Sequence, residues 1–134
     1  MTVYLTETDP RWAGHSGGEG HYGLEWGPED LERAAVFVAE LAPQALQLFE
    51  YLLRNPGREI HCTELAAKAL AGSDDLDPAR RIAGVLSGMS RAHGNSGRRY
   101  PFSWWEAPEA GGGATYAVRP SVAAVFLAAR LGGR

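Results

Sequence analysis

The order of segments within residues 43–118 restricts the fold of this chain more than any other feature of the sequence. An amphipathic helix is predicted over 43–54, because its apolar residues recur at helical spacing and Asn55-Pro56-Gly57 ends it. A short strand from Arg58 to His61 and a short helix from Thr63 to Leu70 are predicted to follow. The apolar face of the first helix consists of Leu46, Phe49, Leu52 and Leu53.

A third helix is predicted over 78–92. Asp77 is suited to cap its free amide groups, and Pro78 is favoured in the first turn of a helix. The run from Gly94 to Gly97 is predicted to end it, since it contains two glycines. Its buried stripe consists of Ile82, Val85, Leu86 and Met89, which lie at helical spacing.

A β-hairpin is predicted after the third helix, with strands over 99–105 and 115–118 and a tip over 108–113. Successive side chains of a strand point to opposite faces, so one aromatic set is expected to pack on the helices. That set is Tyr100, Phe102 and Trp104. Trp105 then faces outward, where it is available to a partner or to the N-terminal arm.

Residues 1–27 are predicted to be an arm, because the run from Gly14 to His21 is too rich in glycine for a helix or a central strand. Four aromatic residues in this segment predict that the arm is anchored on the body of the protein. They are Tyr4, Trp12, Tyr22 and Trp26. The remaining residues, 28–134, are predicted to form one α+β domain that is mostly helical.

Two further helices, one starting at Pro28 and one over 120–131, are predicted to flank the 43–118 core. Both carry an apolar stripe, and the sequence leaves two uses for these stripes open. They complete the core of the monomer, or they form a homodimer interface through Asp30–Leu41 and Val122–Arg130.

The composition limits the class of protein. A chain of 134 residues suits a single compact domain. No apolar stretch approaches the ~20 residues that span a bilayer, and residues 1–10 lack the form of a signal peptide, so a cytoplasmic location is expected. Cys62 is the only cysteine, which excludes an internal disulfide. The basic residues are twelve arginines and one lysine, a bias typical of GC-rich bacterial genomes.

The net charge of −3 conceals an uneven distribution. Residues 1–50 contain nine acidic and two basic residues, whereas residues 51–134 contain seven acidic and eleven basic ones. Residues 78–105 contain five arginines and no acid. A local positive field favours phosphate binding, although a solvated face on an acidic protein has the same composition.

The segment from Ala45 to Val118 resembles the winged helix-turn-helix domains of bacterial transcription regulators. Three stretches carry the resemblance: the first helix with Asn55-Pro56-Gly57, the run from Cys62 to Ala66, and the Arg80–Arg91 helix followed by a hairpin. The whole chain is similar to small actinobacterial winged-helix proteins of unassigned function. The resemblance implies that helix 78–92 enters the major groove of double-stranded DNA and that the wing, 98–118, contacts the backbone or the minor groove. The implied contact residues are Arg80, Arg81, Ser87, Arg91, Arg98 and Arg99.

Acidic residues near this face keep a second function open. Asp74, Asp75 and Asp77 precede the third helix, and Glu106 and Glu109 lie at the hairpin tip, where they would repel a phosphate backbone. A winged helix that binds another protein, without DNA, would carry such residues. The sequence therefore predicts a DNA-binding regulator or accessory factor, with a protein-interaction adaptor as the alternative.

No enzymatic activity, metal or cofactor is predicted. His61, Cys62 and Glu64 contain the residue types of a nucleophile and its base, but neighbouring residues on a strand point apart. His15 and His21 with His61 and Cys62 lack zinc-ligand spacing. The glycine clusters lack the lysine of a phosphate-binding loop.

Overall fold

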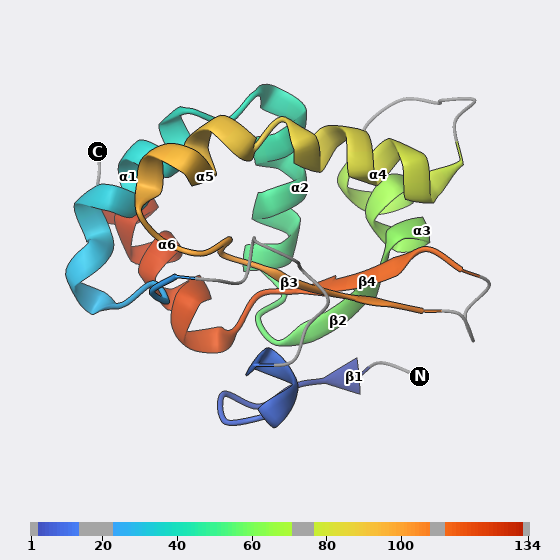
Figure 1. Ribbon diagram of the computed structural model, residues 1–134, viewed down its shortest axis with the longest axis horizontal. Coiled ribbons are helices and arrows are strands. Elements are labelled where there is room, and N and C mark those ends of the chain that lie inside the picture. Colours follow the sequence, from blue (N-terminus) through green and yellow to red (C-terminus); the bar gives the residue numbers. More distant parts are fainter. Residues whose placement is uncertain (1–2, 14–22, 71–76, 108–111, 133–134) are drawn as a thin grey trace.

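The computed structural model describes residues 3–13, 23–70, 77–107 and 112–132. These residues form six α-helices and a small antiparallel sheet, so the predicted α+β and mostly helical fold is confirmed. Figure 1 shows most of the helices on one side of the sheet, with the short N-terminal strand at its lower edge. Among the described residues, no helix combines the length and the apolar character needed to cross a bilayer.

The helices follow the predicted order. A 3₁₀ turn, η3, over Pro28–Asp30 leads into helix α1, and a π-helical turn, η4, over Leu65–Ala69 continues helix α3. The helices are α1 (Leu31–Ala39), α2 (Pro43–Leu53), α3 (Cys62–Glu64), α4 (Pro78–Ser87), α5 (Ser90–Ser96) and α6 (Pro120–Gly132).

The sheet has the strand order β1-β2-β4-β3, and every pair is antiparallel. Strand β2 pairs with β4 through Ile60 and Tyr116, and Tyr116 also lies opposite Trp104 of β3. The chain therefore leaves β2, forms α3 and α4, and returns to the same sheet as the β3–β4 hairpin. The strands are β1 (Val3–Tyr4), β2 (Arg58–His61), β3 (Ser103–Glu106) and β4 (Ala114–Ala117).

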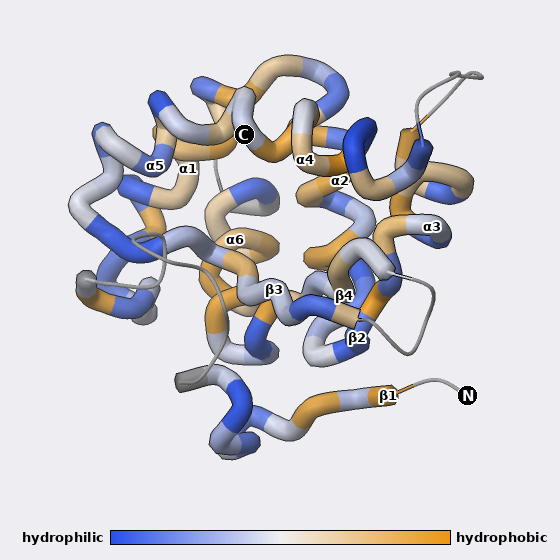
Figure 2. Tube along the Cα trace, turned by 45° about the vertical axis from the view of Figure 1, so that its right-hand side comes forward, coloured by the Kyte–Doolittle hydropathy of each residue, from blue (hydrophilic) through white to orange (hydrophobic). Residues whose placement is uncertain are grey.

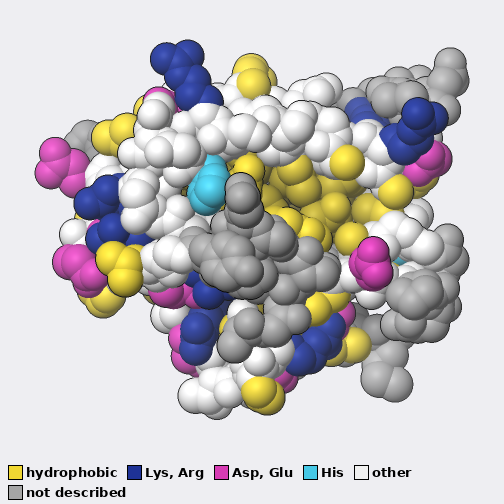
Figure 3. Space-filling model, viewed as in Figure 1, with side chains coloured by type: hydrophobic (Ala, Val, Ile, Leu, Met, Phe, Trp, Pro, Cys, Tyr) yellow, Lys and Arg dark blue, Asp and Glu magenta, His cyan; other side chains and the backbone are white. Residues whose placement is uncertain are grey.

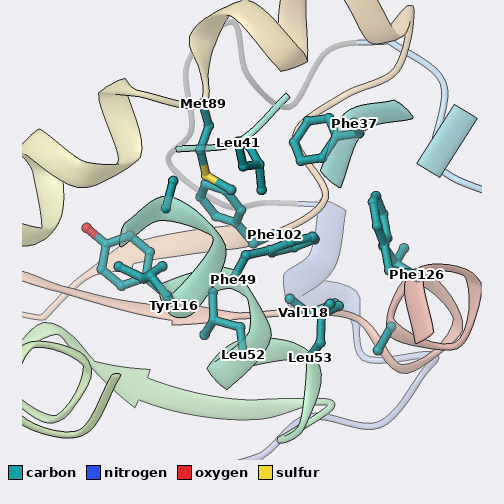
Figure 4. Close-up of a cluster of buried hydrophobic side chains, with 14 of the residues drawn as sticks. Phe37, Leu41, Phe49, Leu52, Leu53, Met89, Phe102, Tyr116, Val118 and Phe126 are labelled. Carbon is teal, nitrogen blue, oxygen red and sulfur yellow. The ribbon is translucent and has the colours of Figure 1, made fainter. Parts of the chain in front are cut away.

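The main core lies between the sheet, α2 and the flanking helices α1 and α6. Its centre is a group of aromatic rings, in which Phe126 lies 4.9 Å from Phe49 and 5.7 Å from Phe37 between ring centroids. Figure 4 shows these side chains pointing toward one another from different helices, with Leu52 and Val118 beneath them. Figure 2 shows hydrophobic stretches of α2 and α6 in the middle of the molecule.

The flanking helices pack on each other, and their apolar stripes are used within the monomer. Phe37 of α1 and Phe126 of α6 are both buried in the same core. This matches the first of the two alternatives that the sequence left open. The large apolar side chains that α1 leaves exposed are Leu31 and Val36.

Helix α4 is shorter than the helix predicted over 78–92, because the helix is interrupted at Gly88 and Met89. The amide of Gly88 donates to the carbonyl of Val85, and the amide of Met89 donates to the carbonyl of Leu86. Each bond therefore joins residues three apart, as in a 3₁₀ turn, and not four apart, as in an α-helix. The side chain of Met89 is fully buried, which anchors the turn. A separate helix, α5, then continues through Gly94 and ends before Gly97, whose φ of +69° suits glycine. The prediction of one helix over 78–92 was therefore wrong, whereas the helical segment does end within the run from Gly94 to Gly97, as predicted.

The first strand of the hairpin is also displaced from its predicted range of 99–105. It begins only at Ser103, because the backbone of Arg99 is engaged elsewhere. The amide of Arg99 donates to the carbonyl of Leu24, and its carbonyl accepts a hydrogen bond from the indole of Trp26. The segment before β3 is thus held by the chain that precedes α1.

Two of the four predicted aromatic anchors are confirmed. Trp12 and Trp26 are buried, whereas Tyr4 is 65% exposed, and Tyr22 lies outside the described residues. Trp12 packs on Trp105 with 5.8 Å between ring centroids, and the guanidinium of Arg11 lies over the Trp105 ring. The outward face of the hairpin is therefore covered by the arm, which was one of the two partners expected for Trp105.

Replacement of Asp77 by alanine is expected to destabilise the protein by about 1 kcal/mol. The Asp77 carboxylate accepts hydrogen bonds from the amides of Ala79 and Arg80, at 3.0 and 3.2 Å, and caps α4. Urea denaturation measures the change, and Asp77→Ser, which keeps a capping oxygen, is expected to lose less. Equal losses for the two variants would contradict the capping role.

Candidate nucleic-acid interface

The outward face of α4 is open and built from small residues. Arg80, Gly84 and Ser87 are exposed and lie at helical spacing, opposite the buried Ile82. A Cβ placed on Gly84 would meet nothing within 4 Å. The Ser87 hydroxyl donates to the carbonyl of Gly84 at 2.7 Å, so its oxygen remains available as an acceptor. Another molecule can therefore approach the backbone of α4 closely.

Two of the predicted contact arginines are exposed. Arg80 extends from α4 and Arg91 from α5, and neither pairs with an acid within the part of the chain that the structure describes. Arg81 is half-buried and already interacts with another residue of the chain. Arg80 and Arg91 thus supply the cationic character of the face.

Arg98 is half-buried and pairs with a buried acid. Its guanidinium binds the Asp30 carboxylate with distances of 2.9 and 3.1 Å, and the Asp30 residue is only 3% exposed. Burial by itself raises the pKa of Asp30, but hydrogen bonds from Arg98 and from the Gly27 amide outweigh it and hold that pKa below its usual value. Arg33 completes the cluster, with its Nε 3.4 Å from Asp30 Oδ1. Arg98 therefore serves to join the segment after α5 to the start of α1.

Arg99 is half-buried and faces an acidic residue. Burial raises the pKa of Glu25, and the positive charge of Arg99 lowers it in part. The five arginines between residues 78 and 105 consequently do not form one continuous exposed surface. The acids Asp74, Asp75 and Glu109, which argued against DNA in the sequence, lie outside the described residues.

A groove between α4 and the β3–β4 hairpin borders this face. Its volume is about 260 Å³. Figure 3 shows a hollow with hydrophobic walls beneath α4. Among the described residues it is lined from α4 by Ala83, Leu86 and Ser87, and from the hairpin and the segment before it by Tyr100, Phe102, Trp104 and Tyr116.

The groove was not predicted from the sequence. Alternation correctly placed Tyr100, Phe102 and Trp104 on one side, and Phe102 is buried as expected. Tyr100 and Trp104 are only half-buried and form a wall of the groove instead. The exposed small residues of α4 leave space that the aromatic rings do not fill, and residue type alone carries no signal for such a space.

His61 and Cys62 are closer than the sequence suggested. The Cys62 sulfur lies 3.8 Å from His61 Nδ1, because Cys62 already belongs to α3 and not to β2. His61 Nδ1 accepts from the amide of Thr63, and Nε2 donates to the carbonyl of Gly112 at 2.8 Å, so the imidazole caps α3. Cys62 is buried. Its closeness to His61 follows from the start of α3, where His61 is the capping residue and Cys62 is the first residue of the helix. The described residues contain no cluster of three or more potential metal ligands among His, Cys, Asp and Glu.

Comparison with known proteins places this architecture in a family. The chain belongs to a family of unknown function (DUF6416), whose sequence profile matches residues 31–133. The matched range contains α1 through α6 and the hairpin, and it begins after the arm. Neither the curated proteins nor the solved structures contained a match to the chain.

Proposed function

We propose that this protein binds double-stranded DNA, as a transcriptional regulator or an accessory DNA-binding factor, through a winged helix-turn-helix. The observation that carries the proposal is the chain order of α2, β2, α3, α4, β3 and β4, with β2 paired to β4. In a winged helix-turn-helix the third helix of this order is the recognition helix and the hairpin is the wing. The corresponding elements here are α4 and β3–β4.

The surface of α4 supports this role. A recognition helix must bring its backbone near the base edges, and Gly84 and Ser87 leave room for that approach. Arg80 of α4 and Arg91 of α5 are exposed and suit phosphate oxygens or the acceptor edge of guanine. Arg98 is excluded from the proposed contact set, because it holds Asp30.

The number of available arginines sets the expected salt dependence. Each phosphate neutralised by a cationic side chain contributes about −0.9 to the slope of log affinity against log salt. Two exposed arginines give a slope of about −2, and Arg81 and Arg99 would add to it only by leaving their present partners.

The double variant Arg80→Ala/Arg91→Ala is expected to weaken DNA binding by at least tenfold and to reduce the salt slope by about 2. Removing both guanidinium groups takes away the exposed positive charge of the face while leaving the core untouched. Fluorescence anisotropy with labelled duplex DNA at several salt concentrations measures both quantities.

Arg54→Ala is the matched control, because Arg54 is an exposed arginine at the end of α2. We expect it to bind DNA as the natural chain does. Undiminished binding by the double variant would remove the α4 face from the proposal. A natural chain that binds no duplex at micromolar concentration and low salt would contradict DNA binding itself and favour the protein-interaction adaptor.

A further inference from the structure

The groove between α4 and the hairpin is lined by a tyrosine whose hydroxyl lacks a partner. Tyr116 is only 7% exposed, and no residue of the described chain hydrogen-bonds its hydroxyl. Buried polar groups are nearly always hydrogen-bonded, so this hydroxyl calls for a partner from outside the chain. Figure 4 shows the hydroxyl oxygen at the outer end of the ring, away from the phenylalanine cluster. The hydroxyl is therefore directed toward the contents of the groove.

Two hydroxyl groups define the hydrogen bonds that the groove offers. Burial, with a smaller contribution from Cys62, raises the pKa of Tyr116 to about 12. The Tyr116 hydroxyl consequently stays protonated at neutral pH and can both donate and accept a hydrogen bond. The Ser87 hydroxyl also lines the groove, but it already donates to the carbonyl of Gly84 and can only accept. An occupant with a hydroxyl or a carbonyl group would satisfy Tyr116.

The aromatic wall of the groove is fixed by contacts within the chain. His93 stacks on Tyr100 with 4.0 Å between ring centroids, and Trp104 also has a partner elsewhere in the chain. Neither ring is therefore a free platform on which a ligand could stack. The planes of Tyr100 and Trp104 stand at 82° to each other, so they form a corner and not a slot for a flat ring. A compact, rounded body fits such a corner better than a planar one.

The other wall of the groove is aliphatic and comes from α4, through Ala83 and Leu86. None of the described residues that line the groove is charged. A charged group that entered would lose its hydration without gaining an opposite charge, which is unfavourable. The volume of about 260 Å³ lies below the range typical of ligand pockets, which is about 300–1,000 Å³. The groove therefore suits a small, neutral and mostly apolar molecule.

We propose that the groove binds a small neutral molecule with a compact aliphatic body and one hydroxyl or carbonyl group, which hydrogen-bonds to the Tyr116 hydroxyl. The aliphatic body packs against Ala83 and Leu86 of α4. An apolar hollow with a few convergent polar groups is the usual form of a small-molecule site. This inference goes beyond the proposed function and does not rest on it, because the lining residues form the groove without DNA.

The test titrates three probes into the isotope-labelled full chain and follows the methyl resonances of Ala83 and Leu86 by NMR. The probes are cyclohexanol, methylcyclohexane, which has a methyl group in place of the hydroxyl, and cyclohexanecarboxylate, which is charged. We expect cyclohexanol to shift these resonances in a saturable manner, with a Kd of about 1 mM, as is reasonable for so small a ligand. We expect no saturable shift with cyclohexanecarboxylate, because the described lining carries no cation.

Two variants assign the binding to the groove. Tyr116→Phe removes only the hydroxyl and is expected to weaken cyclohexanol binding about fivefold, without weakening the binding of methylcyclohexane. Ala83→Phe adds a ring at an exposed position of α4, fills the groove and is expected to abolish the binding of both probes. Tyr51→Phe is the control for the lost hydroxyl, because that hydroxyl binds Glu64 outside the groove. Ala35→Phe, at an exposed position of α1, is the control for the added ring.

Three results would overturn this inference. The first is the lack of a saturable shift with cyclohexanol up to its solubility limit, which would mean that solvent alone satisfies the Tyr116 hydroxyl. The second is an equal effect of Tyr116→Phe on cyclohexanol and methylcyclohexane, which would remove the hydrogen bond. The third is binding that survives in Ala83→Phe, which would place the ligand elsewhere. None of these experiments contains DNA, so their failure leaves the proposed function standing, and the failure of DNA binding leaves this site standing.

Discussion

Replacement of Phe126 by alanine is expected to destabilise the protein by about 3–5 kcal/mol. Phe126 is fully buried, and its ring lies 4.7 Å from Trp26, 4.9 Å from Phe49 and 5.7 Å from Phe37 between centroids. Its removal leaves a cavity that the rings of three separate segments cannot all move to fill. Since domains of this size are stable by about 5–15 kcal/mol, the loss is a large share of the total.

Urea denaturation followed by tryptophan fluorescence measures this loss, because Trp26 reports directly on the cluster. Phe126→Leu keeps most of the volume and is expected to cost less than half as much. Ala124→Ser, at an exposed position of α6, is the control for changes in the helix itself. A loss below about 1 kcal/mol for Phe126→Ala would show that α6 does not hold the core together.

Arg98→Ala is the second large effect, with an expected destabilisation of about 3–5 kcal/mol. The variant leaves the Asp30 carboxylate buried, with the Gly27 amide at 2.9 Å and the more distant Arg33 guanidinium as its remaining donors. A buried charge that loses its main partner is strongly destabilising. Denaturation with urea at neutral pH measures the effect, and Arg54→Ala again controls for the loss of an arginine.

The same variant is expected to show a distinctive pH dependence. The pKa of Asp30 in the folded protein lies below its ordinary value of 3.8. The stabilisation from this pair is therefore fully present above about pH 4 and is lost as the pH falls through the folded pKa. The difference between Arg98→Ala and the natural chain should shrink in acid, because a protonated Asp30 needs no cation. A difference that does not change with pH would mean that Arg98 stabilises the protein by packing alone.

Local patterns predicted the helices and the hairpin because each pattern depends on residues close together in the chain. The apolar spacing around Phe49 and the cap at Asp77 locate α2 and the start of α4 correctly. The short strand at Arg58–His61 was also found, although only the structure shows that it pairs with β4.

Contacts between distant residues could not be predicted from one sequence. Arg98 and Asp30 are 68 positions apart. From the sequence alone, a pair of arginines before a strand is as consistent with a phosphate-binding surface as with an ion pair inside the fold. The break at Gly88 depends on how deeply Met89 is buried, which is a property of the packed core. The groove between α4 and the hairpin likewise forms only when these two distant segments pack together.

The N-terminal arm has a consequence for how copies of this chain behave in a crowded solution. Strand β1 covers the edge of β2, and Glu7 binds Arg119 and Ser121 nearby. An uncovered strand edge can pair with a strand of another chain. The two residues of β1 pair with this edge of β2 and so block it. The opposite edge, at β3, is short, ends in the charged Glu106 and follows Pro101. The arm therefore acts against aggregation, because both edges of the sheet resist the addition of a foreign strand.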